Sequence, residues 1–153
     1  IENGNGYTEK FIAKYGEKNT IIISAEIENQ INQLGDQVEK ENYMKMLDMK
    51  KTGLNNLIKK GYNLLSLETF FTSGLEESRA WTIKKNFTAP KAAGEIHTDF
   101  EKGFIRAETV SYNDFVENEG WLKSRESGKM RLEGKDYIVK DGDILNFRFN
   151  TWP

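Results

Sequence analysis

Residues 89–108, APKAAGEIHTDFEKGFIRAE, are the stretch from which the fold of the C-terminal part can be inferred. Pro90 stands at its start, where a missing backbone N–H costs a helix little, so a short helix is predicted from Pro90 to Phe100. The run from Phe104 to Val110 is rich in aromatic and β-branched residues, which favour a strand. The stretch therefore predicts a helix followed directly by a strand.

Strand-like segments lie on both sides of this stretch. Residues 69–72 and 78–83 precede it, and residues 136–139 and 144–149 follow it. A strand pair, a helix and then further strands are the element order of a β-grasp fold. We therefore predict an α+β fold, of the ubiquitin-like β-grasp type, for residues 65–153.

Residues 1–64 have a different pattern. Residues 20–23 read Thr-Ile-Ile-Ile and predict a buried parallel strand, and Ser24 is a suitable N-cap for a helix after it. Residues 54–65 carry apolar side chains at spacings of three and four, which predicts an amphipathic helix. A single strand cannot complete a sheet, so this part is expected to be the end of a larger α/β domain.

The composition limits the class of protein. The chain has 153 residues, of which 37% are hydrophobic, and it has no cysteine. No run approaches the roughly 18 apolar residues that a membrane helix needs, and no disulfide framework is possible. We expect a soluble cytoplasmic protein that binds no membrane.

His97 is the only histidine, so neither a multi-histidine nor a cysteine-based metal site is expected. A nearby carboxylate, Asp99, makes a local structural contact the expected role of this side chain. No catalytic residue and no metal ligand are predicted.

Two segments imitate functional motifs. Residues 128–136 resemble a phosphate loop, but five residues separate the glycines instead of four, and Asp136 replaces the required hydroxyl. Residues 140–143 contain Asp141-Gly142 between strand-like runs, which is a strong hairpin signal. We therefore predict a loop and a turn in place of nucleotide or metal sites.

Basic residues are not concentrated in either half of the chain, whose formal net charge is −2, so DNA is not an expected partner. Residues 121–135 nevertheless have a local excess of lysine and arginine. This excess is consistent with phosphate contact, and equally with a solvated surface of mixed charge.

Several long segments resemble one known family. Residues 67–74, 77–83, 89–108, 134–143 and 147–150 are similar to the TGS domain of the YchF/Obg-like ATPases, and these matches cover most of the C-terminal half. Upstream, Ser24 to Glu28 is similar to the last guanine-nucleotide-type motif of that family. The resemblance thus extends over nearly the whole chain.

The resemblance implies two parts, residues 1–64 as the C-terminal strand-helix remnant of a P-loop NTPase domain and residues 65–153 as the TGS domain. The parent would bind ATP with Mg²⁺, and GTP weakly, but these 153 residues contain no phosphate loop, so no cofactor and no hydrolysis are expected here. Ser24, Ala25 and Glu26 would lie beside the nucleotide base.

The resemblance also implies a ribosome, through rRNA or a ribosomal protein, as the partner. The candidate contact residues, chosen for their charge, are Arg79, Lys102, Arg106, Lys123, Arg125, Lys129 and Lys135. An alternative is a TGS-type interaction module from a different GTPase or a tRNA synthetase.

Overall fold

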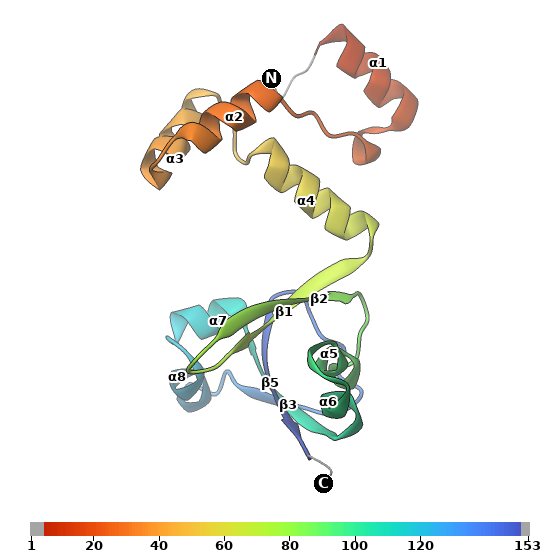
Figure 1. Ribbon diagram of the computed structural model, residues 1–153, viewed down its shortest axis with the longest axis vertical. Helices are drawn as coiled ribbons and strands as arrows, with labels where there is room; N and C mark the ends of the chain where they lie inside the picture. Colours follow the sequence, from red (N-terminus) through yellow and green to blue (C-terminus); the bar gives the residue numbers. More distant parts are fainter. Residues whose placement is uncertain (1–4, 151–153) are drawn as a thin grey trace. The chain divides into compact units, whose positions relative to one another are not determined.

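The structure is a computed structural model that describes residues 5–150 (Figure 1). Its internal contacts divide the chain into two compact units, Ile1–Leu64 and Leu65–Pro153. Within the described residues, every helix is too short or too polar to cross a membrane.

The first unit is helical. Its elements are α1 (Gly6–Tyr15), the 3-10 turn η1 (Glu17–Asn19), α2 (Ala25–Gln33), α3 (Gln37–Met46) and α4 (Gly53–Leu64). Ser24 caps α2, because its Oγ accepts a hydrogen bond from the Ile27 N–H at 3.4 Å. Glu28 Oε1 accepts a 2.6 Å hydrogen bond from the Gly53 N–H and so joins α2 to α4. The helices predicted after Ser24 and along residues 54–65 are confirmed.

The strand predicted for residues 20–23 is wrong. In the described part of the first unit all regular elements are helices, so this segment has no neighbouring strand to pair with. Ile23 is 42% exposed, and the Thr20 carbonyl accepts a hydrogen bond from Lys60 Nζ. A β-branched run favours extended backbone, but a strand forms only where other strands satisfy its N–H and C=O groups.

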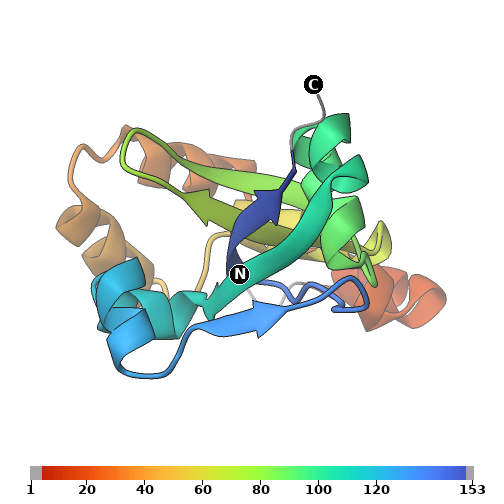
Figure 2. The same cartoon turned by 90° about the horizontal axis from the view of Figure 1, so that it is seen from below.

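The second unit is built on a five-stranded sheet (Figure 2). The strands are β1 (Leu67–Ser73), β2 (Ser78–Lys84), β3 (Phe104–Ser111), β4 (Arg131–Glu133) and β5 (Asp143–Phe149). Their order is β2-β1-β5-β3-β4, with β5 parallel to β1 and all other neighbours antiparallel. The unit is therefore a mixed α+β fold in which the last strand of the chain lies at the centre.

One face of the sheet forms the core with α5 (Ala89–Ile96) and α6 (Thr98–Lys102). Phe70 on β1 is fully buried, and its ring contacts Phe147 on β5 edge to face at 5.9 Å. The alanines of α5 have small side chains, so the helix can lie close to the sheet. The fully buried alanines are Ala89, Ala92 and Ala93.

The helix predicted from Pro90 to Phe100 is interrupted at His97. Pro90 occupies the first turn of α5 as predicted, but His97 has extended backbone and separates α5 from α6. The His97 Nδ1 accepts a 3.2 Å hydrogen bond from the Asp99 N–H and lies 3.5 Å from the Asp99 carboxylate. The structural role predicted for His97 is confirmed.

Two short helices pack on part of the opposite face. They are α7 (Tyr112–Glu117) and α8 (Trp121–Glu126). Trp121 Nε1 donates a 2.9 Å hydrogen bond to the Ser73 carbonyl at the end of β1, and the Tyr112 ring lies 5.8 Å from that of Phe71. The remainder of this face stays open to solvent along β3 and β5, where Arg106 and Arg148 are exposed.

The strand predicted for residues 136–139 is also wrong. In this segment only Ile138 forms an isolated bridge, to Thr88. The strand that pairs with the outer edge of β3 is β4, which lies within the segment predicted to be a loop. Val139 is buried under the sheet from a loop, so its hydrophobic character reflects packing and not a ladder. Gly142 has φ of 85° in the predicted Asp141-Gly142 turn, but the turn leads from this loop into β5 and closes no hairpin.

We expect Phe70→Ala to lower the free energy of unfolding of the second unit by roughly 3–5 kcal/mol, because it leaves a cavity at the centre of the core. Urea unfolding followed by tryptophan fluorescence measures this unit, since every tryptophan lies after Leu65. Leu75→Ala is the matched control, because Leu75 is fully exposed and its truncation should change stability by less than about 0.5 kcal/mol. Equal losses in the two variants would contradict the assigned core.

Candidate phosphate-binding surface

Among the seven basic residues predicted for partner contact, Arg125 reaches a buried carboxylate, and Arg106 lies on the sheet face that carries it. Glu108 on β3 is only 6% exposed, and its carboxylate accepts a 2.8 Å hydrogen bond from Asn146 Nδ2. Arg148 Nη2 lies 3.2 Å from the same carboxylate, and Arg125 Nη2 lies 3.7 Å from it. Strands β3 and β5 and helix α8 therefore converge on Glu108.

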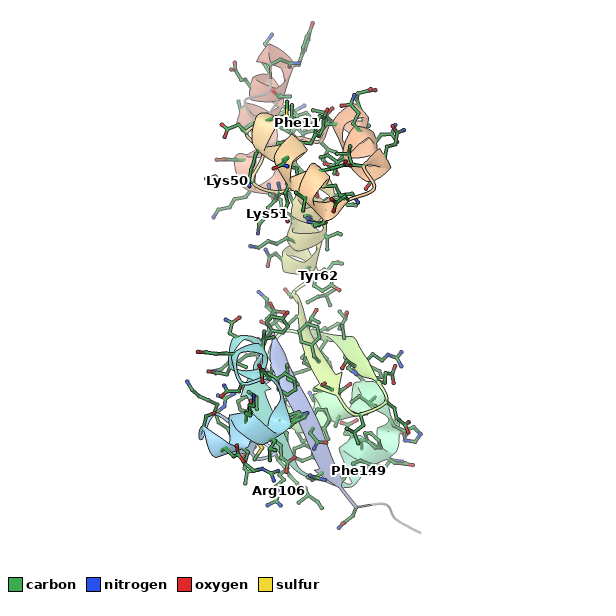
Figure 3. All side chains as sticks on the ribbon, turned by 90° about the vertical axis from the view of Figure 1, so that its left-hand side faces the viewer. Phe11, Lys50, Lys51, Tyr62, Arg106 and Phe149 are labelled. Atoms are coloured by element: carbon green, nitrogen blue, oxygen red, sulfur yellow. The ribbon has the colours of Figure 1, made fainter. Side chains whose placement is uncertain are left out.

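Arg106 completes this group through the strand register. It lies directly opposite Arg148 in the antiparallel β3–β5 pair, and both side chains are on the face opposite the core. Figure 3 shows Arg106 at the surface of the second unit. We call Arg106, Arg125 and Arg148 the arginine cluster.

Arg148 was missed by the sequence prediction. The alternation along β5 places Ile144, Asn146 and Arg148 on one face, but the sequence does not reveal which residues of β3 lie opposite them. Arg148 was therefore identified only from the strand register of the structure.

The other basic residues of segment 121–135 are mostly engaged by carboxylates. Lys123 pairs with Glu119, and Lys129 Nζ lies 3.1 Å from Asp114 Oδ1. A hydrogen bond from the Ser111 hydroxyl, followed by the contact with Lys129, lowers the pKa of Asp114, and the hydrogen bond with Asp114 raises the pKa of Lys129. These two lysines thus form local ion pairs within α7, α8 and their connections.

Arg131 belongs to a polar network on the core side of β4. It lies 3.6 Å from Asp143 and also 3.6 Å from Glu133, and its Nη2 donates to the Tyr137 hydroxyl at 3.2 Å. Tyr137 donates in turn to Asp143 Oδ2 at 2.7 Å. Burial of the phenol, followed by this hydrogen bond, raises the pKa of Tyr137 to about 12.

The remaining three predicted contact residues lie apart from the arginine cluster. Arg79 on β2 stacks over Trp81 with 4.2 Å between the guanidinium carbon and the ring centre. That side chain is on the core side of the sheet, where Trp81 packs against the hydrophobic core. Lys102 ends α6, and Lys135 is in the turn after β4. The structure therefore divides the predicted set into separate groups.

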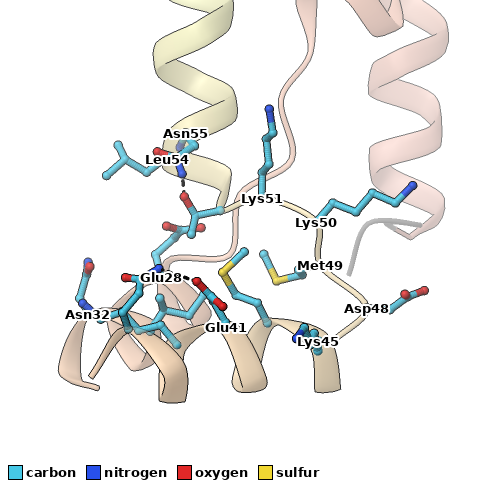
Figure 4. Close-up of a pocket in the computed structure, with 15 residues that line it drawn as sticks. Glu28, Asn32, Glu41, Lys45, Asp48, Met49, Lys50, Lys51, Leu54 and Asn55 are labelled. Carbon is cyan, nitrogen blue, oxygen red and sulfur yellow. Dashed lines mark hydrogen bonds between the residues drawn. The ribbon is translucent and has the colours of Figure 1, made fainter. Parts of the chain in front are cut away.

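Ser24, Ala25 and Glu26 lie together at the start of α2 in the first unit. The Ser24 hydroxyl is engaged in the helix cap, and Glu26 accepts a 3.1 Å hydrogen bond from Gln30. A pocket of about 820 Å³ opens between α2, α3 and the start of α4, and Figure 4 shows Lys50 and Lys51 extending from the loop before α4. Ser24, Ala25 and Glu26 are not among its lining residues.

Across residues 5–150, no group of three or more acidic or histidine side chains is placed to hold a metal ion. The arginine cluster itself offers charged hydrogen-bond donors, which suit an anion.

Comparison with known families identifies this donor surface as part of a known domain. The model of the YchF-GTPase_C family, described as a protein of unknown function (DUF933), matches residues 67–150. The chain belongs to this family. The resemblance to YchF proteins inferred from the sequence is thereby confirmed.

Similar YchF proteins occur in distant organisms. The chain is 55% identical over 131 residues to the protein named "Ribosome-binding ATPase YchF" from Escherichia coli O157:H7, and 51% identical over 131 residues to the protein of that name from Bacillus subtilis. Both matches cover 86% of this chain but only 36% of the relative. The chain thus spans about a third of the length of these YchF relatives.

A solved structure of the Schizosaccharomyces pombe YchF GTPase has the same fold over this region. The match has a TM-score of 0.79 at 35% identity and covers 96% of this chain and 39% of that one. The mixed α+β sheet described above is therefore a property of YchF proteins.

The raised pKa of Tyr137 gives a pH prediction for this YchF domain. An ordinary tyrosine ionises near pH 10, so between about pH 10 and 12 the unfolded chain loses this proton while the folded chain retains it. Stability contributed by the phenol is therefore complete below pH 10 and is lost as the pH rises toward 12.

We expect the urea midpoint of the wild-type chain to fall more steeply over this interval than that of Tyr137→Phe, which has no phenolic proton. Tyr7→Phe is the control, because Tyr7 is largely exposed and lies in the first unit. Parallel pH dependence of the wild type and Tyr137→Phe would contradict the assignment.

Proposed function

We propose that residues 65–153 are the TGS domain of a ribosome-associated P-loop ATPase and that this domain docks the enzyme on the ribosome. The observation that carries the proposal is the family match over residues 67–150, together with relatives that are named ribosome-binding ATPases. A docking role on the ribosome implies a cytoplasmic protein.

The sheet topology supports the β-grasp part of this proposal. A β1–β2 hairpin is followed by a helix on one face, and the last strand returns to the centre parallel to β1. A ubiquitin-like β-grasp has this arrangement, in which the sheet curves around one main helix. The match in element order and direction favours a TGS domain over an unrelated α+β sheet.

The first unit is proposed to be the end of the NTPase domain and its helical connection. In this proposal Ser24, Ala25 and Glu26 lie beside the nucleotide base, and the parent protein binds ATP with Mg²⁺, and GTP weakly. The described residues of the first unit provide the capped start of α2 at this position. The chemistry of phosphate transfer belongs to the parent ATPase.

Membership in the YchF family favours this parent over the alternative, a TGS-type interaction module of a different GTPase or a tRNA synthetase. The exposed arginines of the second unit supply charged donors suited to a partner rich in phosphate.

We expect the chain to co-sediment with purified ribosomes at low salt and to be released progressively as salt rises, because contacts with phosphates displace condensed counterions. Pelleting would be quantified from 50 to about 300 mM salt, a range over which several phosphate contacts weaken binding markedly. Lys129→Gln is the control, since Lys129 is already paired with Asp114 and its loss should change pelleting little. No pelleting of the wild-type chain at the lowest salt would contradict the proposed docking role.

A further inference from the structure

We propose that the arginine cluster on the open face of the sheet binds the phosphodiester backbone of ribosomal RNA. The inference rests on the proposed function, because it names the part of the ribosome that the domain contacts and the residues that contact it. Arg106 and Arg148 come from paired strands, and Arg125 comes from α8.

Glu108 holds Arg125 and Arg148 in position without occupying all of their N–H donors. The buried carboxylate accepts hydrogen bonds from only one nitrogen of Arg148, whereas a guanidinium has five N–H donors. The side chains of Arg148 and Arg125 remain 52% and 59% exposed. Their remaining N–H groups can therefore bind a further anion at little additional cost in side-chain entropy.

The charge at this surface exceeds what the fold requires. One buried carboxylate needs about one cation for neutralisation, yet two arginines contact Glu108 and a third, Arg106, lies opposite Arg148 on the same sheet face. The acidic side chains Asp114 and Glu119 of the neighbouring helical region are already paired with Lys129 and Lys123. Glu126, exposed beside Arg125, has no ion pair with the cluster within the described part of the chain. An uncompensated positive charge therefore remains on the sheet.

Arg106 is the member that the fold explains least. It is exposed, and in the described residues none of its contacts is an ion pair, whereas Arg148 and Arg125 both reach Glu108. Like charges directly opposite each other on paired strands destabilise a sheet, so the Arg106–Arg148 pair opposes folding. An anion bound between the two guanidinium groups removes this repulsion.

The residue type and surroundings favour phosphate as that anion. All three members are arginines, whose planar fork binds phosphate oxygens through two parallel hydrogen bonds, while the lysines of the same region are used in internal pairs. Arg106 and Arg148 are adjacent on a sheet face that also carries Asn146 and the exposed Leu132. Because ribosomes expose long stretches of RNA backbone, an rRNA phosphodiester is the occupant that best matches this surface.

The test measures binding of the full chain to two probes, ribosomal RNA freed of protein and intact ribosomes, by fluorescence anisotropy and co-sedimentation. Arg106→Gln is the main variant, because Arg106 has no structural ion pair and its loss should leave the fold intact. Lys91→Gln is the control, since this exposed lysine lies on α5, which packs on the other side of the sheet, and is not among the predicted contact residues. Urea unfolding of both variants verifies that each is folded.

We expect Arg106→Gln to weaken binding to protein-free rRNA by roughly tenfold and to reduce the slope of log affinity against log salt by about one, as loss of one phosphate contact predicts. Lys91→Gln should retain wild-type affinity. Arg106→Lys should recover part of the affinity, because it restores the charge but not the fork.

Three outcomes would overturn the inference. Equal weakening by Arg106→Gln and Lys91→Gln would indicate a nonspecific charge effect. Normal binding of Arg106→Gln to both probes would remove the cluster from the interface. If the wild type pelleted with ribosomes but had no affinity for protein-free rRNA, docking would be assigned to a ribosomal protein, and the proposed function would remain intact. If the wild type did not pellet at all, the proposed function itself would be refuted.

Discussion

The position of β5 at the centre of the sheet is the constraint on which the second unit depends. This strand is the last in the sequence, yet it pairs with β1 on one side and β3 on the other. Its side chains contribute to both faces of the sheet. Leu145 and Phe147 pack in the core, whereas Asn146 and Arg148 contact Glu108 on the opposite face. The core and the arginine cluster therefore form only when the C-terminal strand is inserted.

Carboxylates determine how the basic residues of this domain are used. Asp114 on α7 and Glu119 just after it each form a local pair with a single lysine, Lys129 and Lys123 respectively. Glu108 is different because it is buried within the sheet and is contacted by donors from two other elements, β5 and α8. Burial makes an unpaired carboxylate costly, so Glu108 requires such partners, and it holds them in fixed positions. The need to neutralise Glu108 within the sheet thus also positions the exposed side chains of Arg125 and Arg148.

The hydrophobic pattern predicted a strand correctly only where the segment also has a neighbouring strand to pair with. Residues 69–72, 78–83, 104–110 and 144–149 are strands because each lies beside another in the sheet. The same reasoning failed for 20–23, where no partner strand exists among the described residues, and for 136–139, where Val139 is buried from a loop. The three-residue strand β4 was missed because it is too short to show a periodic pattern.

The sequence by itself determined the family, the element order around residues 89–108 and the local caps, because these depend on contiguous residues. Ser24 and His97 cap helices through backbone groups only two or three positions away, so their roles can be read locally. The sequence also identified Arg106 and Arg125 as candidates by charge, but could not distinguish them from Lys123 or Lys129. Only the tertiary structure decided which lysines and arginines are neutralised in local pairs and which contact Glu108. Contacts with Glu108 depend on strand register and helix packing, and Asn146 and Arg148 are about forty positions away from it in the sequence.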